Sequence, residues 1–112
     1  TLYIMSIVAL KRKTAAKYRA FFADTDVSFV EEAEGTTVNY WLNAIILKDA
    51  ASRDTFLEET NSSAVMTRPI WKLMNELEMY KDNQCNDLTN SKWLEERVVN
   101  IPSSVRRCCM NS

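Results

Sequence analysis

The residues best suited to bind a ligand are Thr67-Arg68-Pro69-Ile70-Trp71, which place a guanidinium near an aromatic ring. A proline steers the residue before it away from helical dihedral angles, so Arg68 is expected in extended chain at the end of a strand. Its planar set of donors suits a carboxylate or a phosphate, and Trp71 would wall off the ligand. An internal salt bridge that packs against Trp71 explains these residues equally well.

A second set of polar side chains lies in residues 38–47, whose alternation predicts the strongest strand of the chain. One predicted face is apolar throughout and holds Val38, Tyr40, Leu42, Ala44 and Ile46. The other begins with two amides around an indole and holds Asn39, Trp41, Asn43, Ile45 and Leu47. That second face is either a solvated sheet surface or the wall of a site, and the pattern favours the solvated surface.

Most catalytic chemistry is excluded by what the chain lacks. It has no histidine to activate a serine or cysteine, and a single glycine cannot build a phosphate-binding loop. The adjacent glutamates, such as Glu31 and Glu32, sit among polar residues, where two carboxylates do not acquire different acidities. Without histidine or a Cys-x-x-Cys pair, zinc has no ligand set. We therefore predict no catalytic residue and no metal site.

Cysteine usage and charge indicate the surroundings of the protein. Cys85, Cys108 and Cys109 form an odd set, which favours a reducing, cytoplasmic location. Residues 1–10 are mostly apolar but too few to span a membrane, so we expect a buried helical start and no membrane contact. The net charge is −1, and the basic cluster within residues 11–19 is typical of a solvated helix face, so we expect no nucleic-acid partner.

Periodicity and capping residues predict the elements that position these side chains. In order they are a long amphipathic helix from residue 4 to about 23, extended chain over 27–30, a turn at Gly35, the strand 38–47, a helix capped by Asp49 or Ser52 to about residue 61, a strand over 64–67, a helix capped by Thr89 or Asn90 to residue 97, and a strand over 98–101. This order predicts one α+β domain over residues 1–112, with about three helices on one face of a small antiparallel or mixed sheet.

Four segments in this order resemble one protein family. They are Lys17-Tyr18-Arg19-Ala20-Phe21-Phe22, Asn39-Tyr40-Trp41-Leu42-Asn43-Ala44-Ile45-Ile46-Leu47, Arg68-Pro69-Ile70-Trp71 and Val99-Asn100-Ile101-Pro102-Ser103-Ser104. Together they are similar to the C-terminal small domain of the DegT/DnrJ/EryC1/StrS aminotransferases, which depend on pyridoxal phosphate and act on sugar nucleotides. The branch that makes amino sugars for surface polysaccharides is the nearest. The likeness is strongest over residues 11–104, which suggests a chain cut from a longer ancestor.

The resemblance implies the fold of the small domain of fold-type I aminotransferases. In that family the cofactor and its Schiff-base lysine belong to a large domain, so this chain alone is expected to bind no cofactor and to be inactive. The residues expected nearest the substrate are Asn39, Trp41, Arg68, Trp71 and Asn75. A histidine is common in the family at the position of Asn75, so a polar contact would survive there but proton transfer would not.

Two functions follow as hypotheses. The first is a stand-alone remnant of the aminotransferase small domain, which is catalytically incomplete and self-associates, with a dimer favoured. A separately encoded large domain is a candidate partner. The alternative is a binding or interaction module that uses the retained fold for an anionic ligand, a sugar nucleotide or a protein partner.

Overall fold

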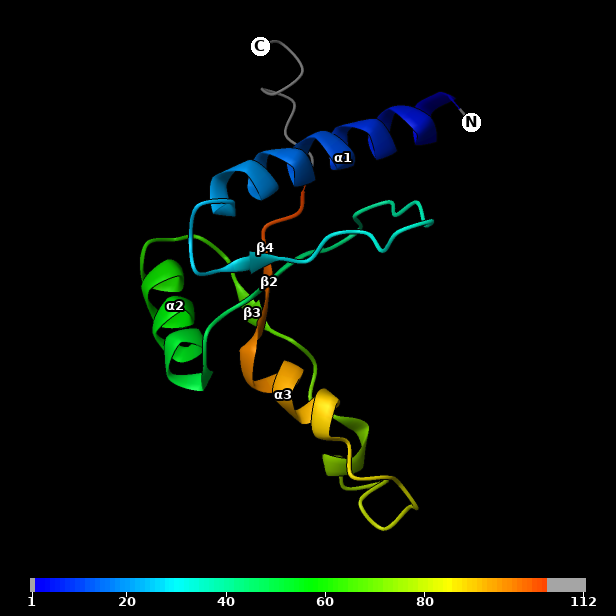
Figure 1. Cartoon of the computed structure of the whole chain (residues 1–112), viewed down its shortest axis with the longest axis vertical. Helices are drawn as coiled ribbons and strands as arrows, with labels where there is room; N and C mark the ends of the chain where they lie inside the picture. The colour runs from blue at the N-terminus through cyan, green and yellow to red at the C-terminus, as the bar shows by residue number, and fades with distance from the viewer. Residues whose placement is uncertain (1, 105–112) are drawn as a thin grey trace.

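The computed structural model describes residues 2–104, and Cys108 and Cys109 lie outside this part of the chain. Its elements, labelled in Figure 1, are α1 (Leu2–Phe22), β1 (Ser28–Phe29), β2 (Asn43–Ile46), α2 (Ala50–Ser62), β3 (Arg68–Pro69), the 3-10 helix η1 (Met74–Glu76), α3 (Thr89–Arg97) and β4 (Val98–Ile101). The strands form an antiparallel sheet in the order β1-β2-β4-β3. The predicted α+β class is confirmed.

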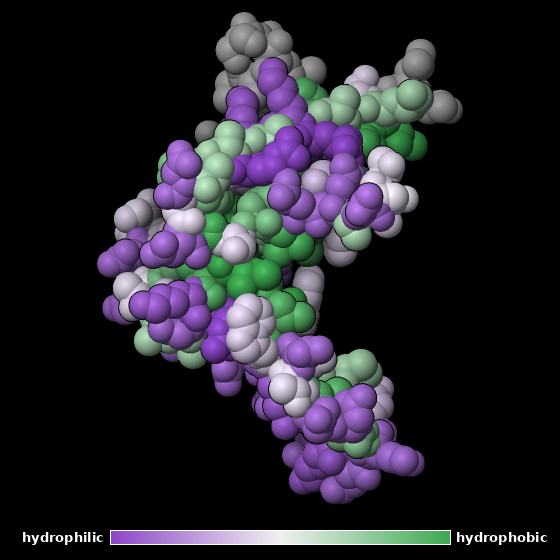
Figure 2. All heavy atoms as spheres, in the orientation of Figure 1, coloured by the Kyte–Doolittle hydropathy of each residue, from purple (hydrophilic) through white to green (hydrophobic). Residues whose placement is uncertain are grey.

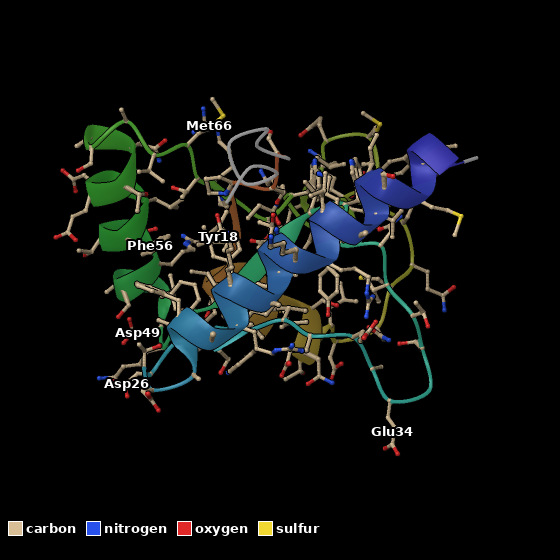
Figure 3. The ribbon with its side chains drawn as sticks, turned by 90° about the horizontal axis from the view of Figure 1, so that it is seen from above. Tyr18, Asp26, Glu34, Asp49, Phe56 and Met66 are labelled. Atoms are coloured by element: carbon tan, nitrogen blue, oxygen red, sulfur yellow. The ribbon has the colours of Figure 1, made fainter. Side chains whose placement is uncertain are left out.

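The core lies on one face of the central strand pair. Ile45 in β2 stands opposite Val99 in β4, so both side chains point the same way and are fully buried. The core cluster comprises Ile45, Leu47, Val99 and Ile101, with Tyr18 and Phe22 of α1 and Phe56 and Leu57 of α2 packed against it. Figure 3 shows α1 crossing above the strands with α2 beside it. These two helices therefore share one sheet face, as predicted.

The predicted assignment of the two faces of residues 38–47 is wrong. Asn43, Ile45 and Leu47, on the face expected to be solvated, are the buried ones, whereas Ala44 and Ile46 on the other face are only partly buried. The alternation was read correctly, but both faces carry apolar residues. The choice between them is made by α1 and α2, which cover the Asn43 side.

The strand is also shorter than predicted. Tyr40 has φ 51°, in the left-handed region that interrupts an extended chain, and the Asn39 side chain accepts a hydrogen bond from Trp41 N at 3.0 Å. β2 consequently begins at Asn43. The preceding residues form a bend that turns the Trp41 indole outwards, where it is 68% exposed.

Residues 4–10 are helical as predicted but not buried as predicted. Ile4 and Met5 are 65% and 63% exposed. The reason is geometric, because the first half of α1 extends past the sheet and only its second half lies over the core (Figure 1). Within the described residues no helix is long and apolar enough to cross a membrane.

Two boundaries after α2 differ from the prediction. The third strand is Arg68–Pro69 rather than residues 64–67, because Ala64 has φ 64° and its N–H still bonds to Asn61 O in the turn that ends α2. The cap of α3 is Leu88, with φ 54° and no side-chain hydrogen bond, rather than Thr89 or Asn90. The predicted Asp49 cap of α2 is confirmed, since its carboxylate accepts from Ser52 N at 2.7 Å.

The molecule is elongated, with extents of 51 × 34 × 26 Å. Figure 1 places α1 at one end of the described chain and the loop before α3 at the other, with the sheet between them. Figure 2 shows apolar side chains at the surface between these ends, over the sheet region. The sheet is thus a small core from which two arms extend.

Candidate functional site

One pocket gathers residues from the two predicted ligand-binding segments. Its volume is about 400 Å³, and it is lined by Lys11, Trp41, Leu42, Met66, Arg68, Asn100, Ile101, Pro102, Ser103 and Ser104. The strand register explains why the two segments lie close together. Arg68 on edge strand β3 stands opposite Asn100 on β4, and β4 also pairs with β2, the strand that follows Trp41. Residues far apart in sequence therefore form one wall.

Arg68 is fixed at one side of this pocket by two acceptors. Its Nη1 donates to Asn61 Oδ1 at 2.9 Å and to Thr67 O at 2.7 Å. Thr67 is itself buried, and its hydroxyl pairs with that of Thr60 at 2.6 Å. Among the described residues both hydrogen bonds of the guanidinium use Nη1, so Nε and Nη2 are left to donate to a ligand.

Lys11 supplies a second cation to the same pocket. Its Nζ donates to Ser103 O at 2.6 Å and lies 3.5 Å from Trp41 O. The ammonium thereby ties α1 to the end of β4, an attachment that the Tyr18 hydroxyl reinforces by donating to Pro102 O at 2.8 Å. Within the described part of the chain, neither Lys11 nor Arg68 forms an ion pair with a carboxylate.

The neighbouring arginines of α1 are neutralised locally. Arg12 holds the Glu32 carboxylate through both terminal nitrogens, at 2.9 and 3.1 Å, and Arg19 pairs with Glu31 at 3.3 Å. The Arg12 hydrogen bond, helped by Val38 N–H, lowers the pKa of Glu32 to about 2. Arg12 and Arg19 are thus compensated by carboxylates, whereas Lys11 in the pocket has no carboxylate partner among the described residues. The expectation of no nucleic-acid partner stays a prediction.

The structure brings together Trp41 and Arg68 of the five predicted site residues. Asn39 lies just outside, where its side chain accepts from Trp41 N. Trp71 is 67% exposed and lines neither this pocket nor the one that contains Asn75. Asn75 belongs to that separate pocket, beyond β3.

Sequence reasoning missed Lys11, Asn100 and Ser103 as pocket residues. Lys11 was placed in a solvated basic face, and the only available signal was its position on the apolar side of the helix. Asn100 and Ser103 lie in the segment Val99-Asn100-Ile101-Pro102-Ser103-Ser104, whose signal in the sequence is the family resemblance alone.

Asn43 is the polar residue buried most deeply beside the pocket. It is 1% exposed, and within the part of the chain that the structure describes neither polar atom of its side-chain amide has a hydrogen-bond partner. Its backbone N–H donates to Ser103 Oγ at 2.7 Å, and that hydroxyl donates to Ile101 O at 2.8 Å. The backbone N–H of Asn43 is therefore paired, and its side-chain amide is not.

No group of three or more histidine, cysteine, aspartate or glutamate side chains that could hold a metal ion occurs among residues 2–104. The polar side chains that line the pocket are instead two cations, one carboxamide, two hydroxyls and an indole. Such a donor set suits an anion.

The fold defines the chain as an aminotransferase-type small α+β domain. It superposes on the crystal structure of the aminotransferase TlmJ from Streptoalloteichus hindustanus with a TM-score of 0.75 and 17% identity, over 86% of this chain and 26% of that one. The sugar aminotransferase CalS13 from Micromonospora echinospora gives a TM-score of 0.74 and 21% identity, over 86% and 25%. At these identities the likeness concerns the fold alone.

Residues 3–108 match the model of the DegT/DnrJ/EryC1/StrS aminotransferase family, and the chain belongs to this family. A curated relative is GDP-perosamine synthase from Vibrio cholerae, with 29% identity over 102 residues, which are 87% of this chain and 27% of that protein. The chain therefore spans about a quarter of the length of the relatives it matches.

Proposed function

We propose that these residues act as the small-domain part of a pyridoxal-phosphate-dependent sugar aminotransferase, and that the Arg68 pocket binds the anionic part of a sugar nucleotide. The observation that carries the proposal is that two cations, Lys11 and Arg68, share one pocket without a carboxylate partner in the described chain. Family membership supports the reaction class. The names of two relatives, a GDP-perosamine synthase and a sugar aminotransferase, support the substrate class.

The pocket residues do not fit pyridoxal phosphate by themselves. That cofactor needs a lysine amine in covalent reach and a partner for its pyridine nitrogen. The pocket is lined by no carboxylate, and the ammonium of its lysine is directed at two backbone carbonyls. In the proposal, the groups that hold the cofactor come from a large domain beyond these residues, and the 112-residue chain transfers no amino group alone.

The contribution of this chain is then binding and orientation. Nε and Nη2 of Arg68 donate to the oxygens of a phosphate or carboxylate, while Asn61 and Thr67 hold the guanidinium in place. Lys11 adds a second positive charge to the same pocket. The exposed Trp41 indole covers the ligand and excludes water from it.

Tryptophan fluorescence tests the anion site directly. In a Trp71→Phe/Trp93→Phe background only Trp41 emits, so a nucleoside diphosphate sugar bound in the pocket should quench or shift that emission saturably. Arg68→Gln should weaken binding about tenfold or more, because a charge-assisted pair is lost. Lys17→Gln removes an exposed cation of α1 outside the pocket and should leave the affinity unchanged.

Equal loss in the Arg68 and Lys17 variants would contradict the proposed site, as would the absence of any response. Mixing the chain with pyridoxal phosphate tests the other half of the proposal. We expect no Schiff-base absorbance above that of free lysines, and stoichiometric formation of such a band would overturn it.

The exposed apolar residues Phe21, Trp41, Met66 and Trp71 favour a further part of the proposal, namely association with a large domain or with a second copy of the chain. The remnant and the binding-module hypotheses share the anion site. They differ in what a large domain would do: the remnant hypothesis expects that adding a large domain restores amino transfer, whereas the binding module needs no large domain.

A further inference from the structure

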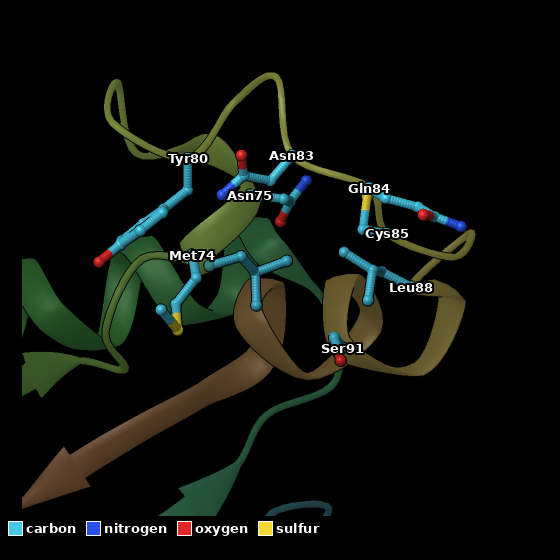
Figure 4. Close-up of a pocket in the computed structure, with 9 residues that line it drawn as sticks. Met74, Asn75, Tyr80, Asn83, Gln84, Cys85, Leu88 and Ser91 are labelled. Atoms are coloured by element: carbon cyan, nitrogen blue, oxygen red, sulfur yellow. The ribbon is translucent and has the colours of Figure 1, made fainter.

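The second pocket has no part in the proposed anion site. It has a volume of about 460 Å³ and lies between η1, the loop after Tyr80 and the start of α3 (Figure 4). η1 is anchored to α3, because Leu73 N donates to Glu95 Oε2 at 2.8 Å. A pocket of this size, held between two joined elements, is in the range of small-molecule sites.

None of the nine lining residues carries a charge. The walls are formed by Leu73, Met74, Tyr80 and Leu88, and three carboxamides lie among them, those of Asn75, Asn83 and Gln84. Burying a charged ligand without a compensating group is costly, so this lining selects a neutral ligand. A tyrosine ring and aliphatic side chains suit a flat one.

Asn75 gives the pocket a specific chemical requirement. Its Oδ1 is buried and has no hydrogen-bond partner among residues 2–104. A buried acceptor left unpaired is destabilising, and a ligand N–H would remove that penalty. A carboxamide also carries a donor next to its acceptor, so the same side chain can donate to a carbonyl beside that N–H. Figure 4 shows the Asn75 amide close to that of Asn83, within the pocket.

We propose that this pocket binds a neutral planar heterocycle with a lactam edge, in which a ring N–H stands beside a carbonyl, as in uracil or hypoxanthine. Asn75 reads that edge and the apolar walls enclose the ring. The inference rests on the Asn75 pocket alone and does not require the aminotransferase proposal. Such a ring can come from a free nucleoside or from the base of a nucleotide.

Two matched ligands test, in the unaltered 112-residue chain, whether Asn75 accepts a hydrogen bond from the ring N–H. 1-Methyluracil keeps the N3–H, whereas 1,3-dimethyluracil replaces it by a methyl group. In a ¹H–¹⁵N NMR titration, 1-methyluracil should shift the side-chain amide signals of Asn75, Asn83 and Gln84 saturably. 1,3-Dimethyluracil should bind about tenfold more weakly or worse, since it leaves Oδ1 unpaired.

A variant pair then locates the site. Asn75→Leu removes the unpaired acceptor with a side chain of similar shape, so it should fold and lose 1-methyluracil binding. Asn90→Leu makes the same change at an exposed position of α3 that does not line the pocket, and binding should persist. Equal affinity for the two ligands, no shifts, unchanged binding by Asn75→Leu, or shifts confined to the Arg68 pocket would each overturn the proposal.

Uridine and UDP distinguish the two sources of the ring. Equal affinity supports a nucleoside site. If UDP binds more tightly than uridine and Arg68→Gln removes that difference, the ligand is a nucleotide that reaches both pockets. If the Arg68 pocket binds no anion but uridine still binds, this inference stands and the proposed function fails.

Discussion

Glu32 illustrates how one side chain joins separate segments of the chain. Its carboxylate accepts from Arg12 of α1 and from Val38 N, while Arg12 also donates to Val38 O at 2.6 Å and lies over the Tyr40 ring. These contacts favour the ionised carboxylate, so the pKa is lowered from 4.5 to about 2. The stabilisation is present above the unfolded value and is lost as the pH falls through the folded one.

We therefore predict that the free energy of unfolding falls between about pH 4.5 and pH 2 and that Glu32→Gln flattens this fall while lowering stability at neutral pH. Urea denaturation followed by circular dichroism over this range measures both effects. Glu34→Gln is the matched control, because Glu34 points away from the molecule at a loop tip (Figure 3). Parallel pH profiles for the chain and Glu32→Gln would contradict the assignment.

The unpaired amide of Asn43 makes a second residue-scale prediction. Replacing a buried unsatisfied amide by an apolar side chain removes a penalty of about 1–3 kcal/mol, so Asn43→Val should raise the free energy of unfolding by roughly 1 kcal/mol. Asn100→Val makes the same change in the neighbouring strand, at a partly exposed position, and should gain less. Urea titration compares them. Destabilisation by Asn43→Val would mean that a buried water pairs with this amide.

For single residues, the sequence predicted the local backbone conformation better than the contacts that each side chain makes. Arg68 was expected in extended chain beside a proline, and it is there. Lys11 and Asn43 were not predicted as special, since a lysine in a basic helix and an asparagine on an alternating strand have many solvated counterparts. Their roles depend on β4, which lies more than half the chain away and whose placement no local pattern specifies.

The end of α2 carries an element-scale prediction. Ala64 N donates to Asn61 O at 3.2 Å and Val65 N to Thr60 O at 2.8 Å, the pair of bonds that closes a Schellman motif. Ala64 occupies its left-handed position with φ 64°, where glycine avoids the clash of a β-carbon. Ala64→Gly should stabilise the chain by about 0.5–1 kcal/mol.

Thermal and urea denaturation check this prediction. Ala16→Gly, at an exposed position in the interior of α1, is the matched control, and it should destabilise by a similar amount because glycine is a poor helix former in a helix interior. A loss of stability in both variants would show that the left-handed position imposes no strain.

Helices were predicted closely because capping and periodicity are local. The capping residue Asp49 predicts the start of α2, and apolar residues at helical spacing occur along nearly the whole of α1. The strands were predicted less well. β2 is cut short by Tyr40 and β3 is displaced past Ala64, since both residues adopt left-handed angles that sequence rarely indicates outside glycine and asparagine.

At the scale of the whole molecule, the radius of gyration is 16.3 Å, above the roughly 13 Å of a compact domain of this length. Apolar side chains at both ends are exposed, among them Ile4, Met5, Met74 and Met79. We predict that the isolated chain self-associates, with the dimer as the main species. Light scattering after size exclusion at increasing concentration measures it.

Ile4→Glu/Met5→Glu should shift that equilibrium towards the monomer by removing apolar area from α1. Ala16→Glu adds a charge at another exposed position of the same helix and should act more weakly. A chain that is monomeric at every concentration would refute the prediction.

The α+β class and the family followed from the order of segments, which survives even where single boundaries are misplaced. The elongated shape could not be predicted from the sequence. The periodicity of α1 shows which of its faces is apolar, but not whether the sheet is long enough to cover the start of the helix.

The pairing of β2 with β4 also determines when the fold can form. Asn43 N bonds to a hydroxyl 60 residues later, and Lys11 reaches a carbonyl 92 residues later. A ribosome therefore delivers α1, β1, β2, α2 and β3 before the strand that holds β2 and β3 together exists. Until that strand emerges, Ile45 lacks its cross-strand neighbour Val99 and one edge of β2 is unpaired, so the nascent chain exposes an apolar strand edge that can pair with other chains.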